Sequence, residues 1–381
     1  MLNLIEEILI LLTLAIGFGE LLKTVKLPEI VGAIIAGIIL GPALLKILSP
    51  NNELSAISTI ALFFIILQIG IEESTDIFSF SLHYMVRFAS LSFIVPLIIM
   101  TIGGNVLFHI HFLQSFATSL AIAIPSISIV SVLLVTSGLI ETDDGRRLLG
   151  GVAFSDLIAF VILSSIKNSI QGIVVIAASL TAFIILLYIL DRYLKIRSQG
   201  LIERAENFIE KRESLLFAIV ILMGFAVSSL FEYIGLTFVL GAFFSGLIIH
   251  GRTVGERAHG ILMRTFSRIN NSFFIPLFFG LSGILVTRIS LNLIPATIFF
   301  ILITSIVGGT FTYLIAKKYL KGRAITAVGI FGARGAVGVI IASISLSRGL
   351  INNDLYTSAI LATVVMAIVF SFIFNLSIDE K

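Results

Sequence analysis

The sequence is poor in charge and has no cysteine. Of 381 residues, 12% are Asp, Glu, Lys or Arg and 58% are hydrophobic, whereas a soluble domain has about 25% charged and about 45–50% apolar residues. The surface of a soluble globule needs polar cover, so this composition argues against a soluble enzyme, a nucleic-acid binder or a disordered chain. The absence of cysteine excludes disulfides, thiol catalysis and thiolate metal sites, and leaves the redox compartment open. With a mean hydropathy of +1.13, the chain is expected to be an integral membrane protein.

Apolar runs separated by short polar breaks recur along the whole chain. A helix rises about 1.5 Å per residue, so runs of about 20 residues can cross a hydrocarbon core ~30 Å thick. The first run lacks the basic start of a signal peptide, because Glu6 and Glu7 stand there, and we interpret it as a span. We therefore expect an all-α membrane protein with thirteen transmembrane helices, at residues 3–22, 29–47, 54–71, 84–103, 113–138, 145–166, 171–190, 213–231, 236–250, 268–286, 291–316, 323–347 and 354–376.

The basic residues are distributed unequally between the expected loops. With the N-terminus outside, 20 of the 25 Lys and Arg residues fall on the cytoplasmic side, four fall outside, and Arg334 lies inside a helix. Cytoplasmic loops of membrane proteins carry an excess of Lys and Arg. The pattern predicts a multi-pass protein of the cell membrane with its N-terminus outside and its C-terminus in the cytoplasm. The longest cytoplasmic link, 191–212, is expected to be an interfacial amphipathic helix joining two halves, with a regulatory role as the alternative.

Two landmarks repeat at an offset of 209 residues. Gly32–Gly37 in the second expected helix resembles Gly241–Gly246 in the ninth, and the same offset carries Pro125 onto Arg334. Helices seven positions apart run in opposite directions through a membrane. We therefore predict an inverted repeat of five helices, helices 2–6 and 9–13, which is the architecture of many secondary transporters.

The second landmark of each repeat, Pro125 in one and the segment around Arg334 in the other, also interrupts a helix. Pro125 removes a backbone hydrogen bond within expected helix 5, and four glycines lie between Gly329 and Gly338 in expected helix 12. Irregular backbone at membrane depth is tolerated where it is buried in protein or lines a cavity. We expect crossed, discontinuous helices 5 and 12 around a binding site, and a simple proline kink is the alternative.

Two charged residues lie far from the helix ends. Asp156 and Arg334 are each expected about eleven residues into a helix entered from the cytoplasm, hence near the midplane. An ionised side chain there costs at least ~2.5–3.5 kcal/mol on insertion scales, so it needs a partner, a hydrated cavity or a function. A buried Asp156–Arg334 ion pair that joins two helices is one interpretation.

A carboxylate at the end of a hydrated funnel has a second use. Desolvation favours its protonated form and a bound cation favours its ionised form, so a proton and a cation compete for Asp156. This competition is the physical basis of antiport. Arg334 is always charged and is expected to balance the site rather than to carry protons. Oxygen ligands for a hard monovalent cation could come from Asp156, from the carbonyls freed at Pro125 and from the hydroxyls of Ser155, Ser126 and Ser128.

Six motifs in order cover almost the whole chain: Leu27–Gly32 running on to Pro42, Gly70–Glu72, Gly145–Arg147 with Phe154–Leu157, Leu240–Phe243, Phe274–Phe279 and Ala333–Val337. Together they resemble the monovalent cation:proton antiporter superfamily, in its bacterial and archaeal second branch. The resemblance implies a single transmembrane transporter domain, 1–381, that forms a homodimer. In it, helices 1–3 and 8–10 (about 1–71 and 213–286) would be the dimer scaffold. Helices 4–6 and 11–13 (about 84–166 and 291–376), linked by 171–212, would be a core that moves like an elevator.

The resemblance also assigns roles by position. Asp156 corresponds to the carrier of cation and proton, and Arg334 to the basic residue of the unwound helix 12. Electrogenic members have two adjacent acids, whereas Ser155 precedes the aspartate here, and expected helix 11 lacks their membrane-embedded lysine. Pro125-Ser126-Ile127 replaces the Ser-Ser-Thr that members often have at the break, which leaves the ion coordination open. One acid and no such lysine predict electroneutral exchange of one cation for one proton.

The sequence thus favours a Na+/H+ antiporter acting in pH homeostasis, not an enzyme. It needs no cofactor, and no phosphate-binding loop for ATP is visible. The expected partners are Na+ (or K+ or Li+), H+, the lipid bilayer and a second copy, with no nucleic acid. K+/H+ exchange stays open because no residue reports the size of the cavity. A cation channel is less favoured because channels typically use rings of equivalent groups. An organic-anion symporter, with a carboxylate next to Arg334, is disfavoured by the single anionic carrier.

Overall fold

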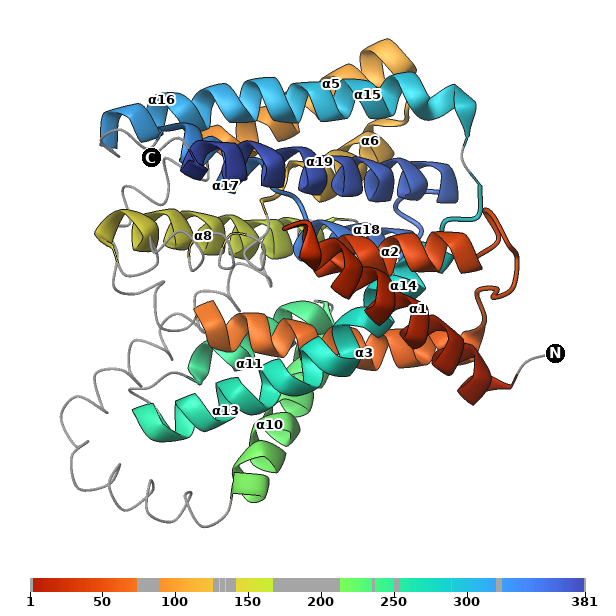
Figure 1. The fold of residues 1–381 in the computed structure, drawn as a ribbon, viewed down its shortest axis with the longest axis vertical. Coiled ribbons are helices and arrows are strands. Elements are labelled where there is room, and N and C mark those ends of the chain that lie inside the picture. Colours follow the sequence, from red (N-terminus) through yellow and green to blue (C-terminus); the bar gives the residue numbers. More distant parts are fainter. Residues whose placement is uncertain are drawn as a thin grey trace. The chain divides into compact units, whose positions relative to one another are not determined.

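The computed structural model describes residues 3–73, 90–125, 130, 134, 142–166, 213–234, 237–249, 254–288, 290–319 and 324–379. All secondary structure in these residues is helical (Figure 1). By their contacts they fall into two compact units. The first comprises Met1–Ser58, Phe80–Ala159 and Pro276–Lys381, and the second comprises Thr59–Ser79 and Phe160–Ile275.

Two helical segments of the first unit include a π-helix. A π-helix, η1, leads into α5, and a second π-helix, η4, joins α15 to α16 along one side of the unit (Figure 1). The elements that lie wholly or mostly in this unit are α1 (Leu4–Thr24), α2 (Glu29–Leu40), η1 (Ser90–Ile94), α5 (Val95–Phe108), α6 (Phe112–Ala123), α8 (Asp143–Ser165), α14 (Ile275–Ile284), η3 (Leu291–Leu293), α15 (Ile294–Ile303), η4 (Thr304–Gly308), α16 (Gly309–Tyr319), α17 (Ala324–Gly332), α18 (Ala336–Ser347) and α19 (Asn353–Asp379).

The second unit is smaller and contains a third π-helix. Its elements are most of α3 (Asn52–Glu73), α10 (Glu213–Tyr233), α11 (Phe238–Ile248), α13 (Glu256–Ile269) and η2 (Asn270–Phe274). Stacked aromatic rings hold its core, with the centroids of Phe63 and Phe225 4.0 Å apart. Thr237 begins α11 as its N-cap and accepts a hydrogen bond from the backbone of Leu240.

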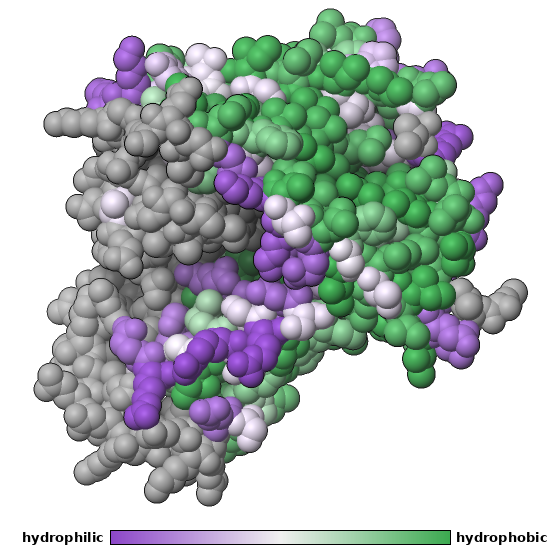
Figure 2. All heavy atoms as spheres, in the orientation of Figure 1, coloured by the Kyte–Doolittle hydropathy of each residue, from purple (hydrophilic) through white to green (hydrophobic). Residues whose placement is uncertain are grey.

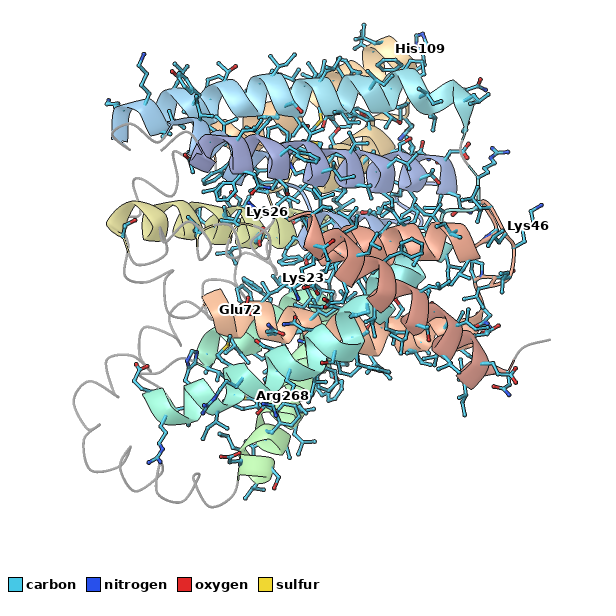
Figure 3. The ribbon with its side chains drawn as sticks, viewed as in Figure 1. Lys23, Lys26, Lys46, Glu72, His109 and Arg268 are labelled. Atoms are coloured by element: carbon cyan, nitrogen blue, oxygen red, sulfur yellow. The ribbon has the colours of Figure 1, made fainter. Side chains whose placement is uncertain are left out.

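Short-range sequence features explain how several helices begin. Asn3 and Glu6 form a capping box at the start of α1, in which each side chain accepts the other residue's backbone N–H at 3.0 and 2.9 Å. After α1 the chain turns through Lys26, whose φ is 59°, and Pro28 caps α2. Lys23 and Glu29 pair across this turn at 2.7 Å, and the carboxylate raises the pKa of the lysine (Figure 3).

Glycines allow α2 to pack backbone to backbone on both sides. A β-carbon at Gly32 would lie 2.5 Å from the nitrogen of Gly19 in α1, and one at Gly37 would overlap the carbonyl of Gly280 in α14. The second unit uses the same device, since a β-carbon at Gly241 would lie 2.6 Å from Cα of Ser228 in α10. Small residues at such contacts are typical of helices that associate within membranes.

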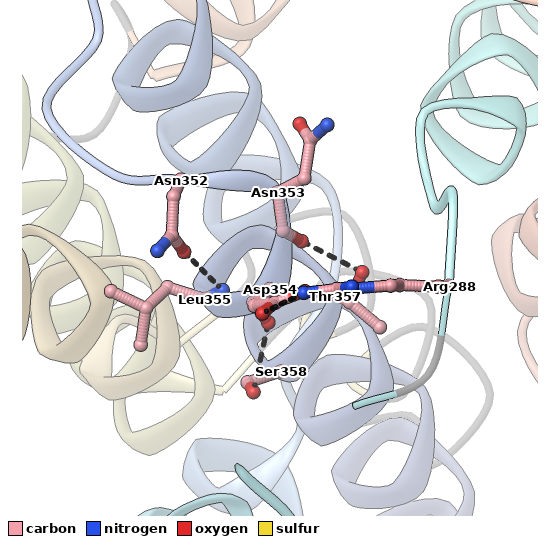
Figure 4. Close-up of polar contacts among 7 residues, drawn as sticks. All are labelled: Arg288, Asn352, Asn353, Asp354, Leu355, Thr357 and Ser358. Carbon is pink, nitrogen blue, oxygen red and sulfur yellow. Dashed lines mark hydrogen bonds and ion pairs between the residues drawn. The ribbon is translucent and has the colours of Figure 1, made fainter. Parts of the chain in front are cut away.

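An exposed ion pair ties the N-terminus of α19 to the segment that follows α14 (Figure 4). Nε and Nη2 of Arg288 contact the two carboxylate oxygens of Asp354 at 3.0 and 2.9 Å. Asn352 precedes the helix and its side chain accepts from the backbone N–H of Leu355 at 2.9 Å. The carboxylate of Asp354 raises the pKa of the arginine and also lies in the first turn of α19, where the helix dipole favours an anion.

The described residues support a membrane protein. Six helices are long and apolar enough to cross a membrane, and α2, α6, α11 and Gly150–Ser165 are apolar but shorter. The expected span at 171–190 lies outside the described residues, so the count of thirteen stays a prediction. The long spans are Asn52–Glu72, Leu91–Phe108, Glu213–Tyr233, Leu291–Lys318, Ala324–Ser347 and Asn353–Ser377.

Three expected boundaries are wrong. The expected helix 84–103 continues to Phe108 at the end of α5. The expected helix 29–47 ends at Leu40, because Gly41 and Pro42 start a run of turns in which Lys46 has a φ of 57° (Figure 3). The expected helix 268–286 begins much earlier, at Glu256, because α13, η2 and α14 follow one another without a break. The charges of α13 favoured a loop, but its buried Ala258, Ile261, Leu262 and Phe266 have helical spacing.

A candidate ion-binding site at two interrupted helices

The first interruption is at the end of α6. The helix stops at Ala123, and Ile124 is extended with φ −74° and ψ 129°. Pro125 explains this directly, because proline disfavours helical geometry in the residue before it and has no N–H to continue the helix. The helix therefore ends where the sequence places the break. Ser126 and Ser128, the predicted hydroxyl ligands, lie outside the described residues.

The second interruption separates α17 from α18. The first helix ends at Gly332, residues 333–335 are not helical, and the second helix starts at Ala336. Close packing accompanies the break, since a β-carbon at Gly329 would lie 2.8 Å from Cα of Phe374 in α19. The expected discontinuity in helix 12 is confirmed at these residues, and Arg334 stands in the middle of it.

Arg334 connects the two interrupted helices. Its side chain is buried, with 1% of the residue exposed. Its Nε donates to the carbonyl oxygen of Ile122 in the last turn of α6 at 2.9 Å, and its Nη1 donates to the carbonyl oxygen of Phe331 in the last turn of α17. Carbonyls in the last turn lack intrahelical donors and carry the partial negative charge of the helix dipole. The guanidinium thus neutralises two helix C-termini that end inside the protein.

A π-helix, η4, lies close to the guanidinium and also close to a second π-helix, η1. A β-carbon at Gly308, the last residue of η4, would lie 4.0 Å from Nη2 of Arg334 and 3.3 Å from the carbonyl oxygen of Ser92 in η1. The hydroxyls of Ser92 and Thr312 are 3.0 Å apart and bind one another. π-helices are rare and often occur at functional sites. The sequence reasoning missed both of them, and only the Gly308-Gly309 pair marks a position where another chain segment approaches closely.

Asp156 lies on α8 in the same compact unit and is fully buried, as is Ser155 beside it. The hydroxyl of Ser155 donates to the carbonyl oxygen of Gly151 at 2.9 Å, so its lone pairs remain available to a ligand. The salt bridges found among the described residues do not include an Asp156–Arg334 pair. Arg334 uses its donors on helix carbonyls instead.

A second polar cluster, mostly buried, occurs in the second unit. Asn270 in η2 donates to the side chain of Gln68 at 2.6 Å and to the carbonyl oxygen of Phe64 at 3.0 Å. Gln68 in turn donates to Glu72 at 2.6 Å and to Ser267 at 3.2 Å. Figure 3 places Glu72 at the end of α3. The cluster ties α3 to the junction of α13 and η2.

Taken together, the fold and the site define a class: an all-helical membrane protein with a buried carboxylate and an arginine held between two helix ends. A sequence profile of the transmembrane sodium/hydrogen exchanger family matches residues 8–376. The chain belongs to this family of monovalent cation:proton antiporters, as its six motifs predict.

Individual relatives agree with this assignment. The chain is 23% identical to a Na+/H+ antiporter of Enterococcus hirae, over 95% of this chain and 94% of the relative. It is 24% identical to a probable Na+/H+ antiporter of Methanocaldococcus jannaschii, over 94% and 92%. The fold is similar to that of the sodium proton antiporter MjNhaP1 from Methanocaldococcus jannaschii, with a TM-score of 0.69 at 16% identity, covering 98% of this chain and 96% of that one.

Proposed function

We propose that this protein is a secondary active Na+/H+ antiporter that exchanges one monovalent cation for one proton at Asp156, and that the exchange is electroneutral. Family membership and the similarity to Na+/H+ antiporters support cation/proton exchange. The observation that carries the proposal is the burial of Asp156 in the unit where Arg334 is already engaged by two helix C-termini.

The charge balance of this arrangement favours electroneutral transport. Arg334 donates to the carbonyls that end α6 and α17 and offsets their partial charges, so we assign it to these helix ends and not to the transported ion. The carrier is neutral when Asp156 is protonated and also neutral when it binds one monovalent cation. The loaded carrier then moves no net charge in either direction.

The proposed cation shell consists of oxygen atoms from three segments. Asp156 supplies the negative charge. Ser155 supplies a hydroxyl oxygen, while its hydrogen is donated to the carbonyl oxygen of Gly151. The break at Pro125 supplies carbonyl oxygens, and Ser126 and Ser128 are proposed to complete the shell. Hard cations prefer such oxygen ligands.

The proposed architecture is an inverted repeat of five helices. Two features at equivalent offsets support it. Gly32 packs on Gly19, and Gly241 packs on Ser228. Each residue of the second contact lies 209 positions after its counterpart in the first. The π-helices η1 and η4 begin at Ser90 and Thr304, a shift of 214 residues, within expected helices 4 and 11.

The proposed mechanism is an elevator within a homodimer. Helices 1–3 and 8–10 form the scaffold, and helices 4–6 and 11–13 carry Asp156 between the two sides of the cell membrane. The apolar side chains that α1 and α10 expose support contact with a second copy or with lipid, with Ile5 78% and Leu222 67% exposed. The N-terminus is outside and the C-terminus is cytoplasmic, as the distribution of Lys and Arg indicates.

Transport by the purified protein in proteoliposomes tests the function. The lumen is acidified and loaded with a pH-sensitive dye, and Na+, K+ or Li+ is added outside. Proton efflux with Na+ that is unchanged by an imposed membrane potential supports the proposal. Proton efflux with K+ but not with Na+ identifies a K+/H+ antiporter. Cation flux without proton movement contradicts antiport.

A further inference from the structure

The outer surface of the first unit has a groove between α16 and α17. Its volume is about 340 Å³. Three of its lining side chains are well exposed: Ile306 at 61%, Tyr313 at 38% and Ile325 at 55%. The groove therefore opens outward from the helices and does not lead toward Arg334. Its lining residues are Ser305, Ile306, Gly309, Thr310, Tyr313, Ile325 and Val328.

The surroundings of the groove match the hydrocarbon of a membrane. The span Leu291–Lys318 has only 22% of its most apolar window buried within the protein. Ile298, Leu302 and Leu314 on this span are each about half exposed, at 50%, 50% and 54%. Figure 2 shows this apolar surface as the broad green area over α15 and α16. An occupant of the groove therefore comes from the lipid phase.

Polar groups inside the groove give it specificity. Three of its lining residues, Ser305, Thr310 and Tyr313, carry a hydroxyl group. A hydroxyl facing hydrocarbon is costly unless it finds a polar partner. Acyl chains alone offer none, whereas the glycerol and ester oxygens of a phospholipid do.

A line of residues leads from the groove to a positive charge. Ile306, Thr310, Tyr313 and Lys317 follow one another at spacings of four, three and four residues, so they share one face of the helix. Lys317 is exposed in the last turn of α16, next to Lys318. In the orientation of the proposed function this end is cytoplasmic, where anionic lipids concentrate.

We propose that this groove is a binding site for one anionic phospholipid of the cytoplasmic leaflet. An acyl chain lies between α16 and α17, Thr310 and Tyr313 donate hydrogen bonds to ester oxygens, and Lys317 pairs with the phosphate. The choice of leaflet rests on the orientation given under the proposed function, whereas binding itself does not depend on antiport.

The site is positioned to act on transport. Ile306 belongs to η4, and Gly309 follows it directly. The last residue of η4, Gly308, would place a β-carbon against Ser92 and near Arg334. A lipid in the groove therefore supports, from outside, the same π-helix that contacts the arginine from inside.

Native mass spectrometry of the purified protein with defined lipids tests the site. Phosphatidylglycerol and phosphatidylcholine with identical acyl chains are compared, and glycerol 3-phosphate serves as a soluble headgroup. We expect preferential retention of one phosphatidylglycerol per chain and no retention of glycerol 3-phosphate. Equal retention of both lipids, or retention of the soluble headgroup, would overturn the proposal.

Two kinds of variant distinguish the contribution of the Lys317 charge to lipid binding from the contribution of the groove. Lys317→Gln is expected to weaken phosphatidylglycerol binding about fivefold, the effect of one basic residue near an anionic surface, without changing phosphatidylcholine binding. Gly309→Leu fills the groove, because its β-carbon meets only Val328 Cγ1 at 3.7 Å, and is expected to abolish retention of the bound lipid. Ile325→Trp fills the groove from its other wall and replaces Gly309→Leu if that variant does not fold.

The matched control is Arg264→Gln, which removes an exposed charge on α13 outside the groove and is expected to bind lipid normally. Wild-type lipid binding by Lys317→Gln and by the groove-filling variants contradicts the site. Conversion of a dimer to a monomer by Gly309→Leu also contradicts it, because the groove is then a protein interface. A protein without transport that still binds phosphatidylglycerol refutes the proposed function and leaves the lipid site standing.

Discussion

Nε of Arg334 and the carbonyl oxygen of Ile122 are 2.9 Å apart, although 212 residues separate them in the chain. This hydrogen bond joins the end of α6 to the gap between α17 and α18. With the bond to Phe331, it places one permanent positive charge where two helix dipoles end. The charge of Arg334 therefore stabilises both interrupted helices.

Arg334→Ala should destabilise the protein strongly. It leaves two buried carbonyl groups without their charged donor, and charge-assisted hydrogen bonds contribute about 1.5–3 kcal/mol each. Arg334→Lys keeps the charge but lacks the planar fork that reaches two carbonyls, so it should be intermediate. Thermal unfolding in detergent measures both, with the exposed Arg268→Ala (Figure 3) as the control. An unchanged melting temperature in Arg334→Ala would show that these bonds do not hold the helix ends.

Gly37→Ala should disrupt the contact between α2 and α14. Its β-carbon would overlap the carbonyl of Gly280, so the two helices must separate, at a cost of about 1–3 kcal/mol typical of overpacking. Gly17→Ala on α1 is the matched control, since no atom lies within 4 Å of its added carbon. That control should raise stability by about 0.5–1 kcal/mol, because alanine is the better helix former. Equal effects of the two substitutions would contradict the packing described for α2.

Tyr356→Phe should remove a buried hydrogen bond between α19 and α14. The phenol donates to the carbonyl oxygen of Ser282 at 2.7 Å, and the residue is fully buried. Loss of this bond should cost about 0.5–1.5 kcal/mol. Tyr233→Phe tests the same chemical change at a side chain that is 89% exposed and should leave the melting temperature unchanged. A larger loss in the exposed variant would be inconsistent with this assignment.

The ion pair at the start of α19 should be sensitive to salt. Arg288 is exposed, so Arg288→Gln should lower the melting temperature slightly at low ionic strength and have no effect at high ionic strength. Asp354→Asn should have the larger effect, because it also removes an anion from the first helical turn. A double-mutant cycle at two salt concentrations separates the two contributions. Coupling between the two residues that is independent of salt would contradict a solvent-screened pair.

The features that the sequence revealed were those with a local chemical cause. α6 ends at Ala123, two residues before Pro125, because proline disfavours helical geometry in the residue that precedes it, and a glycine-rich segment interrupts expected helix 12. The rarity of charge within the spans pointed to Asp156 and Arg334 because burial of an ionised group is costly.

Features that depend on distant contacts were not predictable. The hydrogen bonds of Arg334 need two chain segments to meet, and no residue in either segment encodes the other. The π-helices η1 and η4 have five residues each, which is too short for a period distinct from that of an α-helix to show in the sequence. In α13 the charged residues hid a helical pattern that only the buried face reveals.

The central claim is that Asp156 is the single carrier of both cation and proton. Its most direct test is Na+-driven proton efflux from proteoliposomes containing Asp156→Asn. Asp143→Asn, the same change at the N-terminus of the same helix, is the control. We predict no exchange for Asp156→Asn, with the folded protein retained, and wild-type exchange for the control. Exchange at the wild-type rate by folded Asp156→Asn would contradict the claim.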